Sequence, residues 1–324
     1  MKAPPRPPQR GAALLVAMVL LTLVATLAAG MVWQQWRAVQ VEIAERGRAQ
    51  LAWILNGATD WARLILREDL RADMQKNQLT DHLNEPWAQP LAEARLSTFL
   101  SADQNNTADA DAGPDAFLAG EIIDAQARYN LRNMVAGGQI VPAELEALKR
   151  LCGLLGLPDE LAGRIANGLL AAETNAADAP LLPMQLDDLA WLGVDAASIE
   201  RLRPFAWLLP AQPGAPVAAA VNLNTVPREV IAAALGVDPG TAERLVQTRQ
   251  RQPLLTLDDA KSLLPSTLVL GNNVAVSSHY FEVRGRMRLD DRLLEERSLV
   301  RRDGTNVITL QRWREHRVLP PAGR

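Results

Sequence analysis

The stretch that decides the fold class is residues 12–33, AALLVAMVLLTLVATLAAGMVW, where only Thr22, Thr26 and Gly30 interrupt an apolar run. With about 20 residues, it is long enough to cross ~30 Å of hydrocarbon as a helix. Residues 1–11, MKAPPRPPQRG, are basic and rich in proline. Because a positive flank stays in the cytoplasm, this order predicts one membrane helix with the rest of the chain exported.

Three kinds of amino-terminal segment fit this stretch. A secretory signal peptide cut after Ala29 would have a long apolar region, and Leu27 would stand where such peptides favour a small residue. An uncleaved anchor is the second interpretation. The third, which we favour, is a short basic leader that ends at Gly11 and is cut before Ala12, so that the apolar helix stays in the mature protein.

This layout resembles the leader of type IV pilins and pseudopilins. The resemblance implies that a prepilin peptidase cuts between Gly11 and Ala12 and methylates the new amine. Losing the three basic residues of the leader lowers the formal charge from −3 to −6. Most pilin-like chains carry glutamate at the fifth mature position, where it pairs with the terminal amine of a neighbouring subunit. Here that position is Val16. It predicts a subunit that does not dock beneath another and therefore belongs at the filament tip.

The helix is expected to continue beyond the membrane, over residues 12–70. An apolar stripe with 3-4-3-4 spacing predicts an amphipathic face on which other subunits assemble. Its members are Leu51, Ile54, Ala58, Trp61 and Ile65. Two separate helices, broken near Gly47 or Gly57, are the alternative, although neither glycine forces a break.

Composition excludes several classes of protein. The 324 residues carry a formal charge of −3, which is not typical of a general nucleic-acid binder, and 48% of them are hydrophobic, which excludes wholesale disorder. Cys152 stands alone, so no intramolecular disulfide or multi-cysteine metal site is possible, and it is expected to be a buried small residue. The three histidines are scattered and form no catalytic motif.

Two segments far apart in the chain predict strands. Residues 101–114 are expected to be a loop, and within 120–134 Ile122, Ile123 and Tyr129 predict a strand that ends in a turn at Asn130 and Asn133. Apolar and polar residues alternate strictly over 281–289, which predicts a half-buried strand. Residues 293–301 and 306–313 follow, joined by a hairpin turn at Asp303-Gly304. We interpret the dense arginines here as a solvated sheet face with cross-strand ion pairs, rather than as a nucleic-acid patch.

Between these strands, residues 135–278 read as helical and contain an internal repeat. Leu-Gly-apolar, an acidic turn and a short helix recur from Leu155, Leu192 and Leu235, which predicts helix-hairpin-helix units. Each repeat has a glycine that allows the tight turn: Gly156, Gly193 and Gly236.

The most complete copy, residues 221–264, resembles the helix-hairpin-helix module of DNA-repair and DNA-uptake proteins. In that module, hairpin amides and lysines hold a phosphate. Here Asp238 would repel a phosphate, Pro239 has no amide proton and no lysine is near. A membrane-anchored DNA-uptake protein is therefore kept only as the alternative function, and a protein-binding scaffold is favoured.

Taken together, the chain resembles the general secretion pathway protein K family, the minor pseudopilins K of bacterial type II secretion systems. The segments that carry the resemblance are RGAALLVAMVLL after the leader, EPWAQP at 85–90, IIDAQARYNLRNM at 122–134, PLLPMQLDDLAWLG at 180–193 and VNLNTVPREVIAAALG at 221–236.

The resemblance implies an α+β fold in which a pilin-like long amino-terminal helix packs on a small antiparallel β-sheet, with a large all-α helix-hairpin-helix (SAM-like) insert. The expected pieces are a leader at 1–11, a helix at 12–70 with its membrane part at 12–33, a pilin-like domain formed by 71–134 and 279–318, and the insert at 135–278.

The resemblance also implies a function. Family members associate with minor pseudopilins I and J at the tip of a periplasmic pseudopilus, and contacts with the major pseudopilin, the secretin and exoprotein cargo follow from that position. We therefore expect an inner-membrane protein that is not an enzyme and does not bind nucleic acid. The acidic pairs Asp187-Asp188 and Asp258-Asp259 do not indicate a periplasmic hydrolase, because each is better explained as charge at the start of a helix.

Some family members bind calcium in the insert, near an acidic segment often written Asp-Trp-Ile-Asp. The matching stretch here is residues 167–180, where both aspartates of that segment are absent. Glu173 and Asp178 remain, too few for a cation that takes 6–8 oxygens. We therefore expect no metal and no cofactor.

Overall fold

The computed structural model describes residues 10–95, 116–174, 178–210, 219–289 and 292–318. The predicted loop at 101–114 lies outside these residues. The chain divides into two compact units, Met1–Asn56 and Gly57–Arg324, which we describe separately.

Helix α1 spans Arg10–Lys76 and contributes to both units. It passes through Gly47 and Gly57 without a break, as the sequence predicts, because a single glycine costs only about 1 kcal/mol in a helix. In the first unit, the most apolar part of α1 has no buried residues: the 18-residue window of mean hydropathy 2.5 is 0% buried. This part of α1 is long and apolar enough to cross a membrane.

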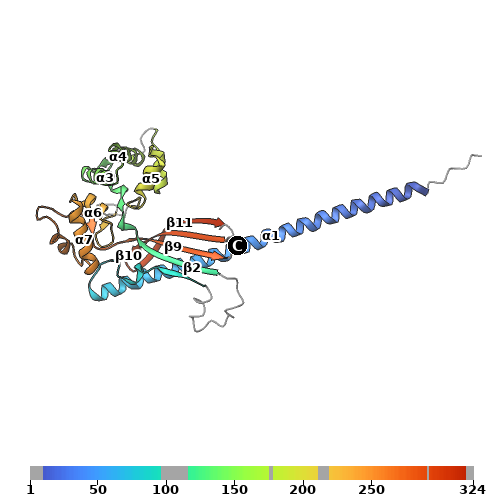
Figure 1. The fold of residues 1–324 in the computed structure, drawn as a ribbon, viewed down its shortest axis with the longest axis horizontal. Coiled ribbons are helices and arrows are strands. Elements are labelled where there is room, and N and C mark those ends of the chain that lie inside the picture. Colours follow the sequence, from blue (N-terminus) through green and yellow to red (C-terminus); the bar gives the residue numbers. More distant parts are fainter. Residues whose placement is uncertain (1–9, 96–115, 175–177, 211–218, 290–291, 319–324) are drawn as a thin grey trace, which may run out of the picture. The chain divides into compact units, whose positions relative to one another are not determined.

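In the second unit, one antiparallel sheet has the strand order β1-β2-β9-β10-β11. Its strands are β1 (Leu91–Arg95), β2 (Ala116–Asp124), β9 (Tyr280–Leu289), β10 (Arg292–Asp303) and β11 (Asn306–Val318). The predicted hairpin is confirmed, with Asp303 opposite Asn306 and Gly304 in the turn at φ 54°. Strands β2 and β9 are neighbours in the sheet although the whole helical region separates them in sequence (Figure 1).

Both faces of this sheet are covered in part, which corrects one expectation. Phe281 and Val283 pack with Ala62 and Leu66 of α1 on one face, whereas Tyr280 packs with residues that follow β2 on the other. Glu282 belongs to the polar half of the alternating pattern, but it is 0% exposed. The predicted solvated face is therefore wrong at Glu282, which the start of the helical region covers, whereas Arg286 is exposed as predicted.

The predicted ion pairs are present, and two of their carboxylates are buried. Glu282 accepts hydrogen bonds from Arg128 at 2.7 Å and from Arg284 at 2.9 Å. Glu296, 1% exposed, pairs with Arg314 at 2.5 Å. These arginines neutralise buried charge, and so they are occupied within the fold rather than arranged as a patch for nucleic acid.

The helices of the second region have their own hydrophobic core, to which Leu148, Ile165 and Ile231 contribute at 0% exposure. Cys152, also 0% exposed, is buried there as expected. The helices are α3 (Pro142–Leu154), α4 (Glu160–Glu173), α5 (Ala196–Leu202), α6 (Arg228–Leu235), α7 (Pro239–Arg251) and α8 (Leu257–Lys261). They group at the end of the sheet where β2 ends and β9 begins (Figure 1).

Short elements join these parts. The short helical turns are η1 (Pro86–Ala88), η2 (Ala125–Ala127), η3 (Leu131–Met134) and η4 (Leu186–Leu192). The short strands are β3 (Tyr129–Asn130), β4 (Val135–Ala136), β5 (Gln139–Ile140), β6 (Ala206–Trp207), β7 (Val221–Asn222) and β8 (Val274–Ala275). The strand predicted from Ile122 and Ile123 is β2, and the turn predicted at Asn130 and Asn133 is η3. The prediction is wrong for Tyr129, because β2 ends in η2 and Tyr129 lies in the separate strand β3.

The three repeat glycines adopt the left-handed conformation that the sequence predicts. The φ angles are 61° at Gly156, 75° at Gly193 and 66° at Gly236. Gly236 ends α6, and α7 begins three residues later. A residue with a Cβ atom is strained at this backbone angle, so the tight turn between the two helices depends on glycine.

This strain gives a direct prediction. Gly236→Ala should lower the free energy of unfolding by about 1–2 kcal/mol. Gly163→Ala is the matched control, because a Cβ there, inside α4, would have nothing within 4 Å. It should raise stability by about 0.5–1 kcal/mol. Denaturant unfolding of the detergent-purified full chain measures both, and equal effects of the two substitutions would contradict the role of the turn.

Candidate functional site

The residues of the predicted processing site lie at the start of α1. Gly11 and Ala12 are in its first turn, and Val16 follows with 57% of its surface exposed. The structure therefore places an apolar side chain, without a carboxylate, on the surface of a helix suited to a membrane. Cleavage and methylation stay predictions.

Apart from Leu51, the predicted assembly face lies beside the buried stripe of α1 and not on it. In the second unit the buried stripe runs through Thr59, Ala62 and Leu66, each one position beyond a predicted residue. Trp61 is 51% exposed, and Ala58 and Ile65 are half-buried. In the first unit, Leu51 is buried and Ile54 is half-buried.

A groove borders this face. Its cavity of about 470 Å³ lies between α1 and the sheet, and Ala58, Trp61 and Ile65 line it together with Trp87 and Ile122. The predicted stripe therefore has an apolar surface that the described part of the second unit leaves accessible. We call it the α1 groove.

A buried polar network joins the helical region to the sheet. Asp124, at the end of β2, accepts hydrogen bonds from Asn222 (3.0 Å), Thr225 (2.6 Å) and Ser278 (2.6 Å) through one oxygen. Its other oxygen accepts from the backbone N–H of Gln126 at 2.7 Å. Burial raises the pKa of Asp124 to about 6, against the opposing effect of these donors. Four donors from three separate segments thus hold one carboxylate.

Asparagine side chains extend this network by binding loop backbones. Asn130 accepts from the N–H of Leu209 at 2.9 Å, and Asn133 donates to the carbonyl of Ala219 at 2.8 Å. Asn224 both donates to the carbonyl of Leu254 and accepts from its N–H, each at 2.9 Å. Local patterns predict a turn at the first two asparagines but not these long-range contacts, for which no local signal exists.

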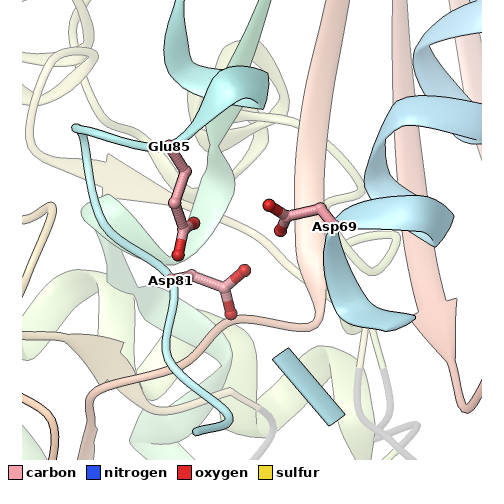
Figure 2. A group of neighbouring side chains, drawn as sticks. All are labelled: Asp69, Asp81 and Glu85. Atoms are coloured by element: carbon pink, nitrogen blue, oxygen red, sulfur yellow. The ribbon is translucent and has the colours of Figure 1, made fainter. Parts of the chain in front are cut away.

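Three further carboxylates meet beside the network. Asp69 comes from α1, and Asp81 and Glu85 come from the segment that follows it; Figure 2 shows the three side chains directed toward one another. One ligand atom from each lies within 4.8 Å of the others. We call this group the carboxylate cluster. Spacing alone did not identify it, because its members come from a helix and from an irregular segment.

The carboxylate cluster contains more acidic groups than basic ones. Arg302 of β10 donates to both oxygens of Asp81, at 2.7 and 2.6 Å, and its other terminal nitrogen lies 3.6 Å from Asp69. Glu85 accepts from the indole N–H of Trp87. Burial, with the neighbouring carboxylates adding to it, raises the pKa of Asp69 to about 7 and that of Glu85 to about 8. Arg302 therefore contacts two of the three acids, whereas Glu85 is bound by Trp87 and by the backbone N–H of His82.

The helical hairpins have acidic caps. Asp238 accepts from the backbone N–H of Thr241 at 3.0 Å, and Asp195 accepts from that of Ser198 at 2.9 Å. These are amides that a phosphate at a helix start would need. The aspartates of the predicted helix starts are caps as well, since Asp188 and Asp259 complete capping boxes. The described hairpins thus use their own carboxylates where an anion would bind.

The insert segment that the family resemblance connects with calcium does not fit a metal ion. Glu173 is the last residue of α4, and Asp178 lies beyond a stretch outside the described residues. Among the residues that the structure describes, no group of three possible ligands forms around them.

Comparison with known proteins gives a match that includes part of the polar network. The family model described as "Type II secretion system (T2SS), protein K" matches residues 221–278, which include Asn222, Thr225 and Ser278 of the polar network. A relative from Pseudomonas aeruginosa, "Type II secretion system protein K", is 29% identical over 88% of this chain and 86% of its own length. One of the same name from Dickeya chrysanthemi is 24% identical over 94% of this chain and 96% of its own.

A solved structure shares the fold. A chain of the crystal structure of the GspK-GspI-GspJ complex from enterotoxigenic Escherichia coli matches 84% of this chain and 98% of its own length, with a TM-score of 0.62 and 20% identity. The chain is similar to type II secretion system protein K over most of its length. The mixed helix-and-sheet fold class is confirmed, and the family is a component of a secretion system.

The segments that carry the resemblance meet at the polar network. Three of the segments that carried the resemblance, 85–90, 122–134 and 221–236, contribute Glu85, Asp124 and Asn222 to it or to the adjoining carboxylate cluster. Those segments are therefore connected by one buried junction, which fixes the helical region on the sheet.

The junction predicts a large effect of a small change. Asp124→Asn keeps the size of the side chain, but it places an amide N–H₂ group opposite hydrogen-bond donors. Some of these buried donors then lose their acceptor. We therefore expect the free energy of unfolding to fall by roughly 3 kcal/mol. Asp258→Asn is the control, because that side chain is 82% exposed, and it should leave stability nearly unchanged. Denaturant unfolding measures both, and a tolerated Asp124→Asn would show that the network is not needed.

Proposed function

We propose that this chain is a minor pseudopilin at the tip of the type II secretion pseudopilus. There it initiates or caps the filament and helps to drive folded exoproteins through the outer membrane. The observation that carries the tip position is Val16, which stands where the pilin-like leader calls for a glutamate. A subunit without that carboxylate lacks the charge pair with which it would dock beneath another.

The charge order around the apolar part of α1 supports an inner-membrane location with the bulk of the chain in the periplasm. Lys2, Arg6 and Arg10 precede the apolar run, which contains no charged residue from 12 to 33. Positive residues stay on the cytoplasmic side, so the chain that follows is exported. In this orientation the sheet and the helical region lie in the periplasm.

Minor pseudopilins I and J are the proposed partners, and prepilin peptidase is the proposed processing enzyme. The similar solved chain was crystallised in a complex of GspK with GspI and GspJ. The α1 groove supports a surface for them, because it is apolar and includes the half-exposed Trp61. The tip position also brings the major pseudopilin, the secretin and cargo within reach.

The helical region is proposed to be a helix-hairpin-helix (SAM-like) insert that acts as a protein-binding cap. The tight turns at Gly193 and Gly236 support the hairpins, and Asp195 and Asp238 occupy the amides that DNA-binding versions use. No observation on the described hairpins favours the alternative of DNA uptake. A non-catalytic role fits a secretion-system component whose buried acids are committed to structure.

The first experiment determines the mature amino terminus. In a bacterial membrane fraction, we expect a chain that begins at methylated Ala12 and stays membrane-bound, because the cut lies before the apolar helix. Intact and peptide mass spectrometry measure it, with Gly11→Val as the control that should keep the leader. A soluble chain that begins near Gly30 would contradict the pseudopilin assignment.

The second experiment tests the α1 groove. Trp61→Glu should reduce co-purification of minor pseudopilins I and J at least about tenfold, since it places a charge on an apolar contact. Trp191→Glu is a matched control, because Trp191 is 52% exposed and Trp61 is 51% exposed. Equal retention of the partners by both variants would exclude the groove as their surface.

A further inference from the structure

We propose that the carboxylate cluster of Asp69, Asp81 and Glu85 binds one divalent cation of the size of calcium. The three ligand atoms lie within 4.8 Å of one another. Calcium binds oxygen at 2.3–2.6 Å, so two ligands on opposite sides of one ion are about 4.8 Å apart. A single ion can therefore reach all three side chains without a rearrangement of the backbone.

Asp69 provides the observation that points to a ligand. Its side chain is only 8% exposed, and its buried Oδ2 has no hydrogen-bond partner. Figure 2 shows this side chain extending from α1 toward Asp81 and Glu85. The Arg302 nitrogen at 3.6 Å is too far for a hydrogen bond to this oxygen. A buried carboxylate oxygen without a hydrogen bond is costly, and a cation between the three groups would satisfy it.

The ionised groups of the cluster carry a net negative charge that a divalent ion can balance. Arg302 pairs with Asp81, donates to the carbonyl of Ser278 at 2.8 Å, and lies 3.6 Å from Asp69. His82 lies 3.4 Å from Glu85, and burial lowers its pKa, which favours the neutral imidazole. Asp73 adds a fourth acid nearby, and Lys76 acts only as a more distant charge. Ionised Asp69, Asp81 and Glu85 with Arg302 carry a net charge of −2, which one divalent cation balances.

Oxygen ligands of this kind are those that calcium prefers, and solvent can reach the cluster. A cavity of about 190 Å³ borders it, lined by Asp73, Asp81 and Arg302 among others. Some carboxylate oxygens are occupied by Arg302, Ser278 and Trp87, so water from this cavity would complete the coordination. The positive charge of Arg302 weakens the attraction of the cluster for a cation. We therefore expect the cluster to bind calcium with moderate affinity.

The bound ion would connect three parts of the fold. Asp69 lies near the end of α1, Glu85 directly precedes η1, and Asp81 is paired with Arg302 of β10. A cation shared by all three acids would hold the helix end on the sheet beside the buried junction. This inference is independent of the tip function, and it concerns a different place from the insert segment with Glu173 and Asp178.

Calcium binding by the full chain in detergent tests the proposal. After EDTA treatment and dialysis, equilibrium dialysis with radioactive calcium should show saturable binding of one ion per chain. Asp69→Asn should weaken this binding at least about tenfold, because it removes the negative charge of a ligand whose buried oxygen has no hydrogen-bond partner. Calcium should also raise the melting temperature of the wild type by a few degrees, and not that of Asp69→Asn.

Two control variants keep the result interpretable. Glu68→Gln changes an exposed acid next to Asp69 on α1, and Glu173→Gln changes the acid at the end of α4. Both should bind calcium as the wild type does. Loss of binding in Glu173→Gln, with retention in Asp69→Asn, would place the ion in the insert and overturn the proposal.

The absence of saturable calcium binding by the wild type at millimolar concentration would also overturn it. In that case the acids hold protons instead of a cation, and Asp69→Asn, which resembles the protonated acid, should be at least as stable as the wild type in EDTA. Because this substitution keeps the size of the side chain, folding of the variant is expected, and circular dichroism verifies it. Glu85→Gln removes the charge of a second proposed ligand, and it should likewise weaken calcium binding.

Discussion

The structure of the second unit depends on the buried carboxylates at the end of β2. Asp124 accepts four hydrogen bonds, and Asp81 is held by Arg302 and by the N–H of Ser278. A buried charge without partners costs several kcal/mol, so each donor must be in place when the chain folds. Because the donors come from η2, from β7 and the turn after it, and from the segment before β9, one set of hydrogen bonds brings the ends of the helical region together.

This constraint explains how a long insertion fits between two neighbouring strands. The end of β2 and the start of β9 pair directly, with Asp124 opposite Phe281, although the helical region lies between them in the chain. The chain must leave and return at one point, and the polar network is located there. The helices can then form a hydrophobic core of their own without disturbing the sheet. The sheet packs separately against α1.

Local patterns predicted the elements well where one physical requirement decides the conformation. The glycines of the repeat adopt positive φ because no other residue does so without strain, and strand β9 alternates because α1 covers one of its faces. Prediction was wrong where a distant segment changed the environment. Glu282 has the alternation of a solvent-facing residue, but it is buried with Arg128, which lies 154 positions earlier in the chain.

The sequence by itself determined an apolar helix without a carboxylate at Val16, the strands of the sheet and the glycine turns. Each of these depends on composition, on periodicity or on residues close in the chain. Only the tertiary structure decided which acids become buried and which meet. Asp69, Asp81 and Glu85 form a cluster, and Asp124 joins Asn222, because folding brings together segments with no local relationship. Contact between distant residues has no periodic signal in one sequence, so the junction and the carboxylate cluster follow only from the three-dimensional arrangement.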